Sequence, residues 1–403
     1  MKRRWVGVAV IAGCLGLVQA ARAQLPPAQA GADSMPEPIP FRPDAGPTNL
    51  VPGPLSPQTA PQGPPDYLSL PADAPGAFPT KRYDPEEAFY FNIGAQLLRR
   101  QSLSNSGVIA VLDPQLLDTG TAAPAGAAVA QKFSDINPHQ NGGPRATFGY
   151  LFNTNQAFEL TGFYIFESNQ TTEVLNPGRV DSFFFNPPLG FEGDNGLWLQ
   201  ADRLSTTLST TLFGAEANYR YTDAAVMGAE LIMGVRYLDL AERLTTRTDD
   251  DGFSFPMVNG LPDPTRIATY SVQTHNRLVA PQLGFEWDKS FTKFLTLGFM
   301  AKGAWGADFV DMDRNLIRGD GLHGFAGKKS DIQFGQMYEM NAFVDFNILE
   351  RARLRLGYNA LWFLNMANVV DQYDFNLKDA NNLNRRSGSI YFQGPMAELQ
   401  FLF

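Results

Sequence analysis

Residues 207–240 read TLSTTLFGAEANYRYTDAAVMGAELIMGVRYLDL, and this stretch decides the fold. On both sides of a short polar break at 222–225, side chains of unlike character alternate along the chain. Glu216 and Arg220 share one side, whereas the positions between them are uncharged. A period of two is typical of a β-strand whose two faces meet different surroundings. The sequence therefore predicts an antiparallel pair of strands joined by a four-residue turn.

The same alternation recurs along the rest of the chain and predicts ten strands. They are expected at 88–99, 144–152, 157–166, 207–221, 226–240, 272–287, 293–305, 333–347, 352–366 and 388–403. The breaks between them alternate strictly, short at 153–156, 222–225, 288–292 and 348–351, long at 100–143, 167–206, 241–271, 306–332 and 367–387. Tight periplasmic turns on one rim and long outer loops on the other are typical of outer-membrane barrels. An even number of strands places both termini on the short-turn rim.

The apolar runs chosen on one face of each predicted strand, such as Leu283, Phe285 and Trp287, contain no charged residue, whereas the opposite faces are charged. Those opposite faces carry Arg145, Glu159, Glu216, Arg220, Glu230, Arg236, Glu286, Lys302, Glu339, Asp345, Arg353, Arg355 and Glu398. A basic side chain facing lipid at the bilayer midplane costs about 2–4 kcal/mol, so a membrane would enforce such a split. A soluble β-sandwich is the alternative, but it would not need connections of alternating length. We therefore predict an all-β, transmembrane up-and-down antiparallel β-barrel of about ten strands over residues 84–403.

The charges expected inside the barrel are nearly balanced, with seven acids and six bases. A ten-stranded barrel is narrow, because its diameter grows with strand number. Opposed charges would therefore pair, for example Glu230 with Arg220 or Glu216 with Arg236. Two interpretations stay open at this point: a selectivity filter for small solutes, or a salt-bridged plug that holds the barrel shut.

The N-terminus has the features of an export signal over residues 1–23. A basic Lys2-Arg3-Arg4 segment precedes an apolar run from Trp5 to Val18, and Ala21-Arg22-Ala23 supplies an A-x-A cleavage pattern. Ile11-Ala12-Gly13-Cys14 permits a second interpretation, a lipobox with an acylated cysteine. Cys14 is the only cysteine, so a disulfide within one chain is impossible.

Residues 24–83 are rich in proline, which removes backbone donors and favours extended chain. Such a segment cannot build a packed core, and we expect a disordered periplasmic linker. An arm that contacts peptidoglycan or a partner is the alternative.

Composition fits this interpretation and excludes several functions. The chain has 32 Lys+Arg and 41 Asp+Glu, a net charge of −9, which argues against nucleic acid as a partner. Charged residues are only 18% and aromatic residues 12% of the chain. The sequence contains neither a phosphate-binding loop nor a dinucleotide fingerprint, so no cofactor is expected.

Candidate catalytic and metal-binding residues are few. The three histidines, His139, His275 and His323, are predicted in loops or near strand ends, without a protease motif around them. The acidic runs 249–251 and 311–313 could attract Ca²⁺ but lack the spaced ligand set of an EF-hand. We therefore expect a protein that is not an enzyme and that binds no metal.

The last strand ends with Leu399, Phe401 and Phe403 at alternate positions. This ending resembles the signal by which barrel-assembly machinery recognises its clients. Aromatic residues near other strand ends suggest girdles at the lipid interfaces, among them Trp287 and the Trp362–Phe363 pair. Outer-membrane lipid and the assembly machinery are thus the expected partners, and a homo-oligomer is left open.

Four segments resemble a known family. They are FGAEANYRY (213–221), MGVRYLDL (233–240), PQLGFEW (281–287) and LRLGYNALW (354–362). They are similar to the planctomycete-type outer-membrane barrels called beta barrel porin family seven, over roughly residues 88–403. The turn at 222–225 lacks the cysteines that members often have there. The resemblance implies a porin-like role and no catalytic residues.

The function predicted from sequence is a porin-like outer-membrane barrel that passes small solutes passively through a charged, loop-constricted lumen. The alternative is a non-conducting structural or surface-binding barrel that acts through its long outer loops. In both cases the expected location is the outer membrane.

Overall fold

The computed structural model describes residues 89–103, 107–114, 125–153, 155–192, 197–222, 229–250, 263–292, 294–349, 351–378, 383 and 386–403. The predicted signal peptide, the proline-rich linker and Cys14 lie outside these residues. No helix in the described part of the chain is long and apolar enough to cross a membrane.

Strands dominate the described residues, and the helical segments among them are two short 3₁₀ turns, η1 (Phe133–Asp135) and η2 (Pro264–Arg266). The strands are β1 (Phe89–Arg100), β2 (Val108–Leu112), β3 (Ala128–Lys132), β4 (Gln140–Asn153), β5 (Gln156–Ser182), β6 (Ala201–Thr222), β7 (Ala229–Asp249), β8 (Ala268–Thr292), β9 (Leu295–Arg318), β10 (His323–Leu349), β11 (Ala352–Ala367) and β12 (Ser387–Leu402).

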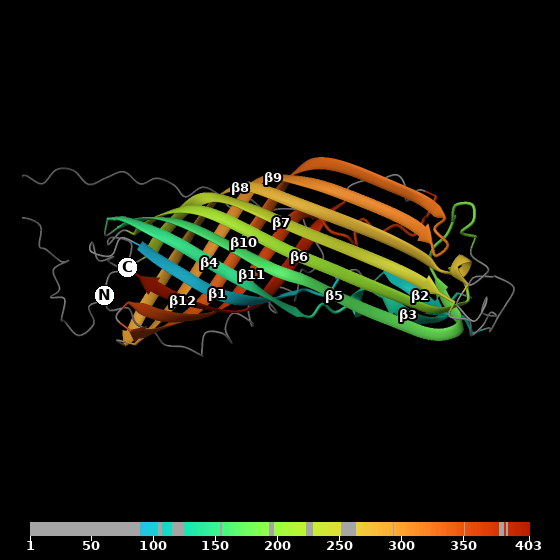
Figure 1. The fold of residues 1–403 in the computed structure, drawn as a ribbon, viewed down its shortest axis with the longest axis horizontal. Helices are drawn as coiled ribbons and strands as arrows, with labels where there is room; N and C mark the ends of the chain where they lie inside the picture. The colour runs from blue at the N-terminus through green and yellow to red at the C-terminus, as the bar shows by residue number, and fades with distance from the viewer. Residues whose placement is uncertain are drawn as a thin grey trace, which may run out of the picture. The chain divides into compact units, whose positions relative to one another are not determined.

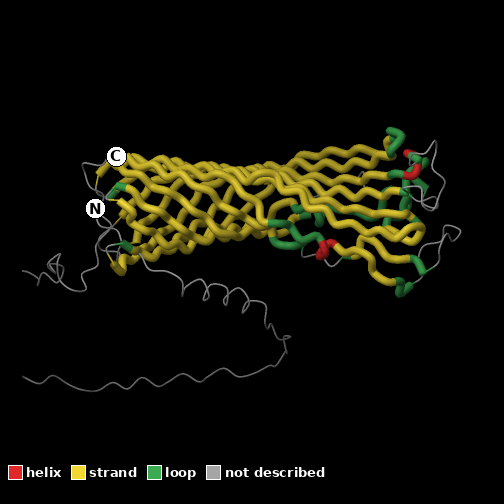
Figure 2. The backbone as a smooth tube through the Cα atoms, turned by 60° about the horizontal axis from the view of Figure 1, so that its bottom comes forward, coloured by secondary structure: helices red, strands yellow, loops and turns green. Residues whose placement is uncertain are grey.

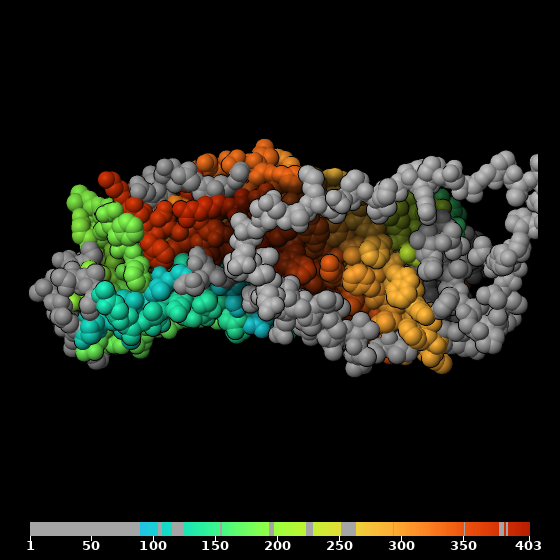
Figure 3. Space-filling model, turned by 180° about the vertical axis from the view of Figure 1, so that it is seen from behind, coloured from blue at the N-terminus to red at the C-terminus, as the bar shows by residue number. Residues whose placement is uncertain are grey.

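Ten of these strands form a closed antiparallel ring. The order is β5-β4-β1-β12-β11-β10-β9-β8-β7-β6, and β6 pairs back to β5. β1 lies between β4 and β12, so the first and last strands close the ring (Figure 1). Seen from behind, the teal residues that follow β1 lie beside the red residues of the last strands (Figure 3). The up-and-down barrel predicted from sequence is confirmed.

The strands are longer than predicted on the side away from the termini. The expected long loop at 306–332 is almost entirely strand, because β9 and β10 pair up to a tight turn at 319–322. β5 likewise continues to Ser182, and β6 begins at Ala201 rather than near 207. The prediction failed here because it followed apolar alternation, which fades where the outward side chains become polar although the backbone pairing continues.

The barrel wall therefore has two different heights. β5 to β10 extend well beyond β1, β4, β11 and β12, and loops with β2 and β3 lie on the shorter side (Figure 2). β2 pairs only with β3 and with the far end of β5, at 180–182. The predicted loop 100–143 thus contains structure of its own.

Side chains of the ring alternate between exposed and buried, as the period-two pattern requires. β6 and β7 show this most regularly, with Glu216 and Arg236 buried and Phe213 and Val235 outward. Phe363, which we expected in an aromatic girdle, points inward instead and is fully buried. Its neighbour Trp362 faces outward and stacks on Tyr391, with ring centroids 4.7 Å apart.

Candidate functional site

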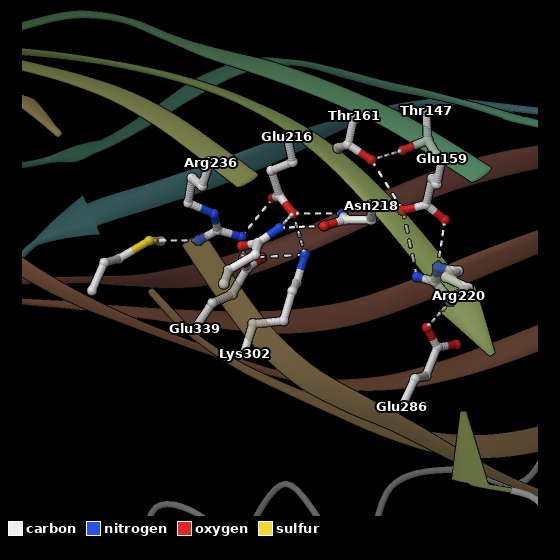
Figure 4. A network of polar contacts seen from close by, with 12 residues as sticks. Thr147, Glu159, Thr161, Glu216, Asn218, Arg220, Arg236, Glu286, Lys302 and Glu339 are labelled. Atoms are coloured by element: carbon white, nitrogen blue, oxygen red, sulfur yellow. Dashed lines mark hydrogen bonds and ion pairs between the residues drawn. The ribbon is translucent and has the colours of Figure 1, made fainter. Parts of the chain in front are cut away.

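The inner face of the barrel is the candidate functional site, because the structure gathers there the charged residues singled out in the sequence. Twelve of the thirteen are buried, and the thirteenth, Arg355, has a side chain that is 13% exposed. All thirteen take part in ion pairs, which form two clusters at different heights along the barrel. Figure 4 shows the central part of both clusters.

The first cluster lies near the short-turn rim and is centred on Arg220 of β6. Its guanidinium contacts Glu159 at 2.7 Å, Glu230 at 2.9 Å and Glu286 at 2.9 Å. These carboxylates come from β5, β7 and β8. Tyr90 donates a hydrogen bond of 2.8 Å to Glu159.

Arg355 of β11 continues this rim cluster across the barrel. It contacts Glu286 at 3.2 Å, and it also pairs with Asp345 of β10, which Arg353 approaches at 3.4 Å. The guanidinium carbon of Arg355 lies 3.6 Å from the ring centroid of Phe343, a cation–π contact. The rim cluster therefore consists of Glu159, Arg220, Glu230, Glu286, Asp345, Arg353 and Arg355.

The second cluster lies deeper in the barrel and is built around two carboxylates. Glu216 contacts Arg236 at 2.6 Å and Lys302 at 2.7 Å, and Glu339 contacts both of these bases. Arg145 joins Glu339, at 3.6 Å, to Glu398 at 2.8 Å. This deep cluster consists of Arg145, Glu216, Arg236, Lys302, Glu339 and Glu398.

Several of these ion pairs join strands that are not neighbours. Lys302 on β9 reaches Glu216 on β6, with β7 and β8 between them, and Arg355 on β11 reaches Glu286 on β8. Such contacts must run through the interior rather than along the wall. The two pairs expected across the turn, Glu230 with Arg220 and Glu216 with Arg236, both form.

An apolar layer fills the barrel beyond the deep cluster. It is made of inward side chains from nine strands of the ring: Leu98, Phe163, Ile165, Leu212, Leu238, Leu240, Leu278, Ala280, Ala304, Met337, Leu361, Phe363, Met366, Ile390 and Phe392. Sequence reasoning missed this layer. The available signal was a loss of alternation, since Leu361-Trp362-Phe363 and Tyr237-Leu238 are apolar on both faces.

The outer half of the barrel is closed by a second apolar cluster and by the segment between β11 and β12. Val369, Val370, Tyr373 and Leu377 of that segment pack against side chains of β6, β7 and β8. Asn276 of β8 anchors the segment, because its side-chain amide donates to and accepts from the backbone of Ala367, each at 2.9 Å.

A buried ion pair lies between the two apolar regions. Arg100 at the end of β1 pairs with Glu242 of β7, and it also donates to Asn368 at 3.3 Å. Arg100 is 5% exposed. Because it joins β1, β7 and the β11–β12 segment, this pair helps to hold that segment inside the barrel.

Tyr270 belongs to the second apolar cluster, which closes the outer half of the barrel. It lies farther from the short-turn rim than the exposed apolar side chains of the wall. Its ring meets that of Tyr373 edge-on, with centroids 5.0 Å apart. Burial raises the pKa of Tyr270 from 10.0 to about 12, since the phenolate would lose its hydration, and Arg314 opposes this effect. Burial also raises the pKa of Tyr373 well above its ordinary value.

The outward surface is divided into an apolar belt and a polar extension. The apolar belt consists of the exposed side chains nearest the short-turn rim, including Phe91, Ile93, Phe148, Leu160, Leu231, Met233, Val235, Val279, Leu283, Phe285, Met340 and Leu356. Beyond it the outward positions of β7 to β10 carry charges, such as Arg277 paired with Asp311 and Lys328 with Asp313.

The histidines and acidic runs form no catalytic or metal-binding set within the described residues. His275, which was predicted near the start of a strand, lies inside β8, and its Nε2 is 2.7 Å from Asp239 on the outward surface. His323 is the first residue of β10, and His139 is exposed just before β4. Asp311 and Asp313, expected in a loop, lie in β9. No group of three or more potential ligands for a metal ion occurs in the described part of the chain.

The C-terminal residues expected to serve in assembly lie on the outward face. Leu399, Phe401 and Phe403 are all exposed, and Phe403 is the most exposed at 64%. The backbone N–H of Phe403 donates to the carbonyl oxygen of Phe89 at 2.8 Å. The chain end is therefore held to the first strand by the barrel closure itself.

Comparisons with known proteins find remote likenesses to solved barrels. The outer membrane protease OmpT from Escherichia coli is 11% identical, with 79% of this chain and 98% of that chain covered and a TM-score of 0.40. A Pseudomonas aeruginosa FadL homologue is 9% identical, covering 78% and 89%, with a TM-score of 0.26. Acinetobacter baumannii CarO2 is 11% identical, covering 78% and 99%, with a TM-score of 0.22. Likenesses this weak carry no conclusion about what this chain does.

No family model matches the chain, and no curated protein matches it either. The resemblance to beta barrel porin family seven is therefore not confirmed.

Proposed function

We propose that this protein is an outer-membrane β-barrel whose interior is shut and which acts through its outer end. This is the second of the two functions considered from sequence. The single observation that carries it is the run of filled layers inside the ring: the rim cluster, the deep cluster and the apolar layer.

The apolar belt supports the membrane placement. Side chains such as Val235 and Leu283 are more than half exposed, which would be unfavourable in water for so many apolar groups together. Lipid removes that cost, and it also accounts for the absence of charge among the described side chains of the belt. A barrel surrounded by water would need no boundary between the belt and the charged level of Arg277 and Asp311.

The filled interior supports the lack of conduction. A hydrated ion would have to separate buried pairs such as Arg236–Glu216 and then pass between the packed apolar side chains of the next layer. Removing an ion from water into such surroundings is strongly unfavourable. The part of the ring inside the membrane therefore acts as a rigid support, from which β5 to β10 extend beyond the membrane.

The outer end supports a surface role. Its apolar cluster includes Phe184, Trp198 and Tyr270, whose rings are in contact, so the outer end has a packed core of its own. A packed core holds the exposed polar residues of the extension in fixed positions. Fixed positions are what a surface that binds a partner requires.

Planar-bilayer recording tests the proposal. Refolded protein, verified by heat-modifiable gel mobility, is expected to give no steady channel events. Regular open events from the folded form would overturn the proposal.

Porin-like passage of small solutes is the second candidate, favoured by the charged side chains on the inner face of most strands. Such passage requires the side chains of both ion-pair clusters and of the apolar layer to move apart. If channel events do occur, Lys302→Glu should shift their preference towards cations, because a buried base within the deep cluster would become an acid. An unchanged preference would place the conducting path elsewhere.

We also propose that Leu399, Phe401 and Phe403 form the assembly signal. Their exposure on one side of the chain end, along β12 and the residue after it, supports the proposal, since a receptor could contact all three at once.

A further inference from the structure

The bases on the outward wall beyond the apolar belt differ in their partners. Four of them pair with a carboxylate, and these pairs are Arg203–Glu173, Arg247–Asp249, Arg277–Asp311 and Lys328–Asp313. Two exposed arginines, Arg99 and Arg243, have no carboxylate partner among the described residues. Their positive charge can therefore attract an anion from outside the protein.

The guanidinium of Arg99 is held in place by neutral oxygens. Its Nε donates a hydrogen bond of 3.0 Å to the carbonyl oxygen of Pro138, and its Nη2 donates to the side-chain oxygen of Asn137. A guanidinium has five N–H groups in a planar fork that matches the oxygens of a phosphate. Within the described part of the chain, three N–H groups of Arg99 thus remain for another acceptor.

Arg99 lies at the level that lipid headgroups would occupy. Leu97, the preceding outward residue of β1, is 45% exposed and belongs to the apolar belt. The polar layer of one leaflet is about 5–8 Å thick. One outward position along a strand advances about 7 Å, and less along the membrane normal because the strands are tilted. The phosphates of lipids that cover the belt would therefore lie beside Arg99.

An aromatic pair marks the same level independently. Trp362 stacks on Tyr391, whose hydroxyl donates a hydrogen bond of 3.0 Å to the side-chain oxygen of Gln393. Gln393 is the residue of β12 that pairs with Arg99. Tryptophan and tyrosine favour the headgroup level of a membrane, because one end of the ring is apolar and the other polar.

Two amide side chains flank Arg99 on the neighbouring strands. Gln140 of β4 and Gln393 of β12 are its partners in the two ladders. The side-chain nitrogen of Gln140 donates to the carbonyl oxygen of Leu97 at 3.2 Å and carries a second N–H. The oxygen of Gln393 is taken by Tyr391, which leaves its nitrogen as a donor. The wall thus presents a row of donors centred on one positive charge.

We propose that Arg99, Gln140 and Gln393 form a binding site for the phosphate group of an anionic membrane lipid. A lipid is favoured over free phosphate because the site continues the apolar belt, so acyl chains on the belt would bring their own phosphate to it. The site rests on the membrane placement proposed above. It does not depend on whether the interior conducts, because Arg99 faces outward.

Arg243 provides a matched control. It is exposed, and its guanidinium donates to the side-chain oxygen of Gln273 at 2.9 and 3.3 Å. It lies six residues beyond Tyr237 on β7, which is about 20 Å along the strand. At the usual tilt this is about 15 Å along the membrane normal, beyond the polar layer of the leaflet. Arg99→Gln and Arg243→Gln therefore remove the same charge from different levels.

Native mass spectrometry of the full chain tests the site. Each variant is refolded, checked by heat-modifiable gel mobility, and placed in mixed micelles with equal amounts of phosphatidylglycerol and phosphatidylcholine of the same acyl chains. The ratio of the two lipids that stay bound is measured. The wild type is expected to prefer phosphatidylglycerol about tenfold, since its phosphate is not neutralised by a choline.

Arg99→Gln should bring the ratio close to one, and Arg243→Gln should leave it as in the wild type. Arg99→Lys should lie between them, because lysine keeps the charge but lacks the planar fork. That variant also serves if Arg99→Gln does not show the mobility of folded barrel.

A wild-type ratio in Arg99→Gln, or an equal loss in Arg243→Gln, would overturn the proposal. Loss of the wild-type preference on adding inorganic phosphate at the concentration of the lipid would also overturn it, because the ligand would then be the free anion. The belt and the conductance are tested by separate measurements, so failure of this site leaves the proposed function standing.

Discussion

Arg220 illustrates how single side chains hold the interior together. It is 8% exposed and contacts three carboxylates from three different strands. A buried pair adds little net stability compared with apolar packing, yet removing one partner leaves an uncompensated buried charge. Removing the residue that several partners share is therefore expected to cost the most unfolding free energy.

Arg220→Met is expected to lower the free energy of unfolding by about 3–5 kcal/mol, because Glu159, Glu230 and Glu286 lose their common cation. Urea titration in vesicles, followed by gel mobility, measures it. Lys328→Met is the control: its pair with Asp313 is 68% and 41% exposed, and its loss should cost at most about 1 kcal/mol. Similar losses in both variants would contradict the assigned role of Arg220.

Tyr270 provides a pH-dependent test at the same scale. Its pKa is raised from 10.0 to about 12, so the folded phenol stays neutral while the unfolded phenol ionises. The stability linked to it is fully present below pH 10 and is lost as the pH rises through about 12. The ultraviolet phenolate titration of wild type minus that of Tyr270→Phe should have its midpoint near 12. A midpoint near 10 would show that Tyr270 is not buried.

At the scale of single strands, the same alternation serves two surroundings. The lower part of β8 presents Leu283 and Phe285 outward, whereas its upper part presents Ser271 and His275. Backbone pairing with β7 and β9 continues through both parts. Strand length is thus set by pairing, and the outward residue type is set by the solvent that each level meets.

Leu283→Arg should cost about 2–4 kcal/mol of unfolding free energy in phospholipid vesicles, because it places a cation in the apolar belt. Ser271→Arg, on the outward face of the same strand beyond the belt, should change stability by no more than about 0.5 kcal/mol. Chemical unfolding of both variants measures the difference. Equal costs would mean that lipid does not contact the barrel at position 283.

At the scale of the whole molecule, closure depends on the pairing of the first strand with the last. β1 and β12 align Ala95 directly opposite Ala397. This contact joins residues from the two ends of the barrel sequence. It leaves the ring without a free edge over its lower part, which in a membrane satisfies every backbone group.

A disulfide tests this closure. Ala95→Cys with Ala397→Cys, in a Cys14→Ala background, should cross-link on oxidation, because opposed residues of paired strands lie within disulfide reach. The oxidised chain should then migrate as a loop after boiling without reductant. Ala95→Cys with Ala360→Cys is the control, since Ala360 pairs with Gln393 of β12 and not with β1. Cross-linking of the control pair alone would contradict the register.

The sequence by itself determined the ten strands, the sides on which their residues lie and the closed ring. The reason is that side-chain character alternates from residue to residue along each strand, which is a local pattern. It also placed Arg220 with Glu230 and Glu216 with Arg236, since a short turn brings those positions together. Only the tertiary structure decided that Lys302 reaches Glu216 across the interior and that Leu212 and Phe363 fill the barrel. Those features join strands distant in the chain, and their geometry depends on barrel diameter and strand length, which no local pattern encodes.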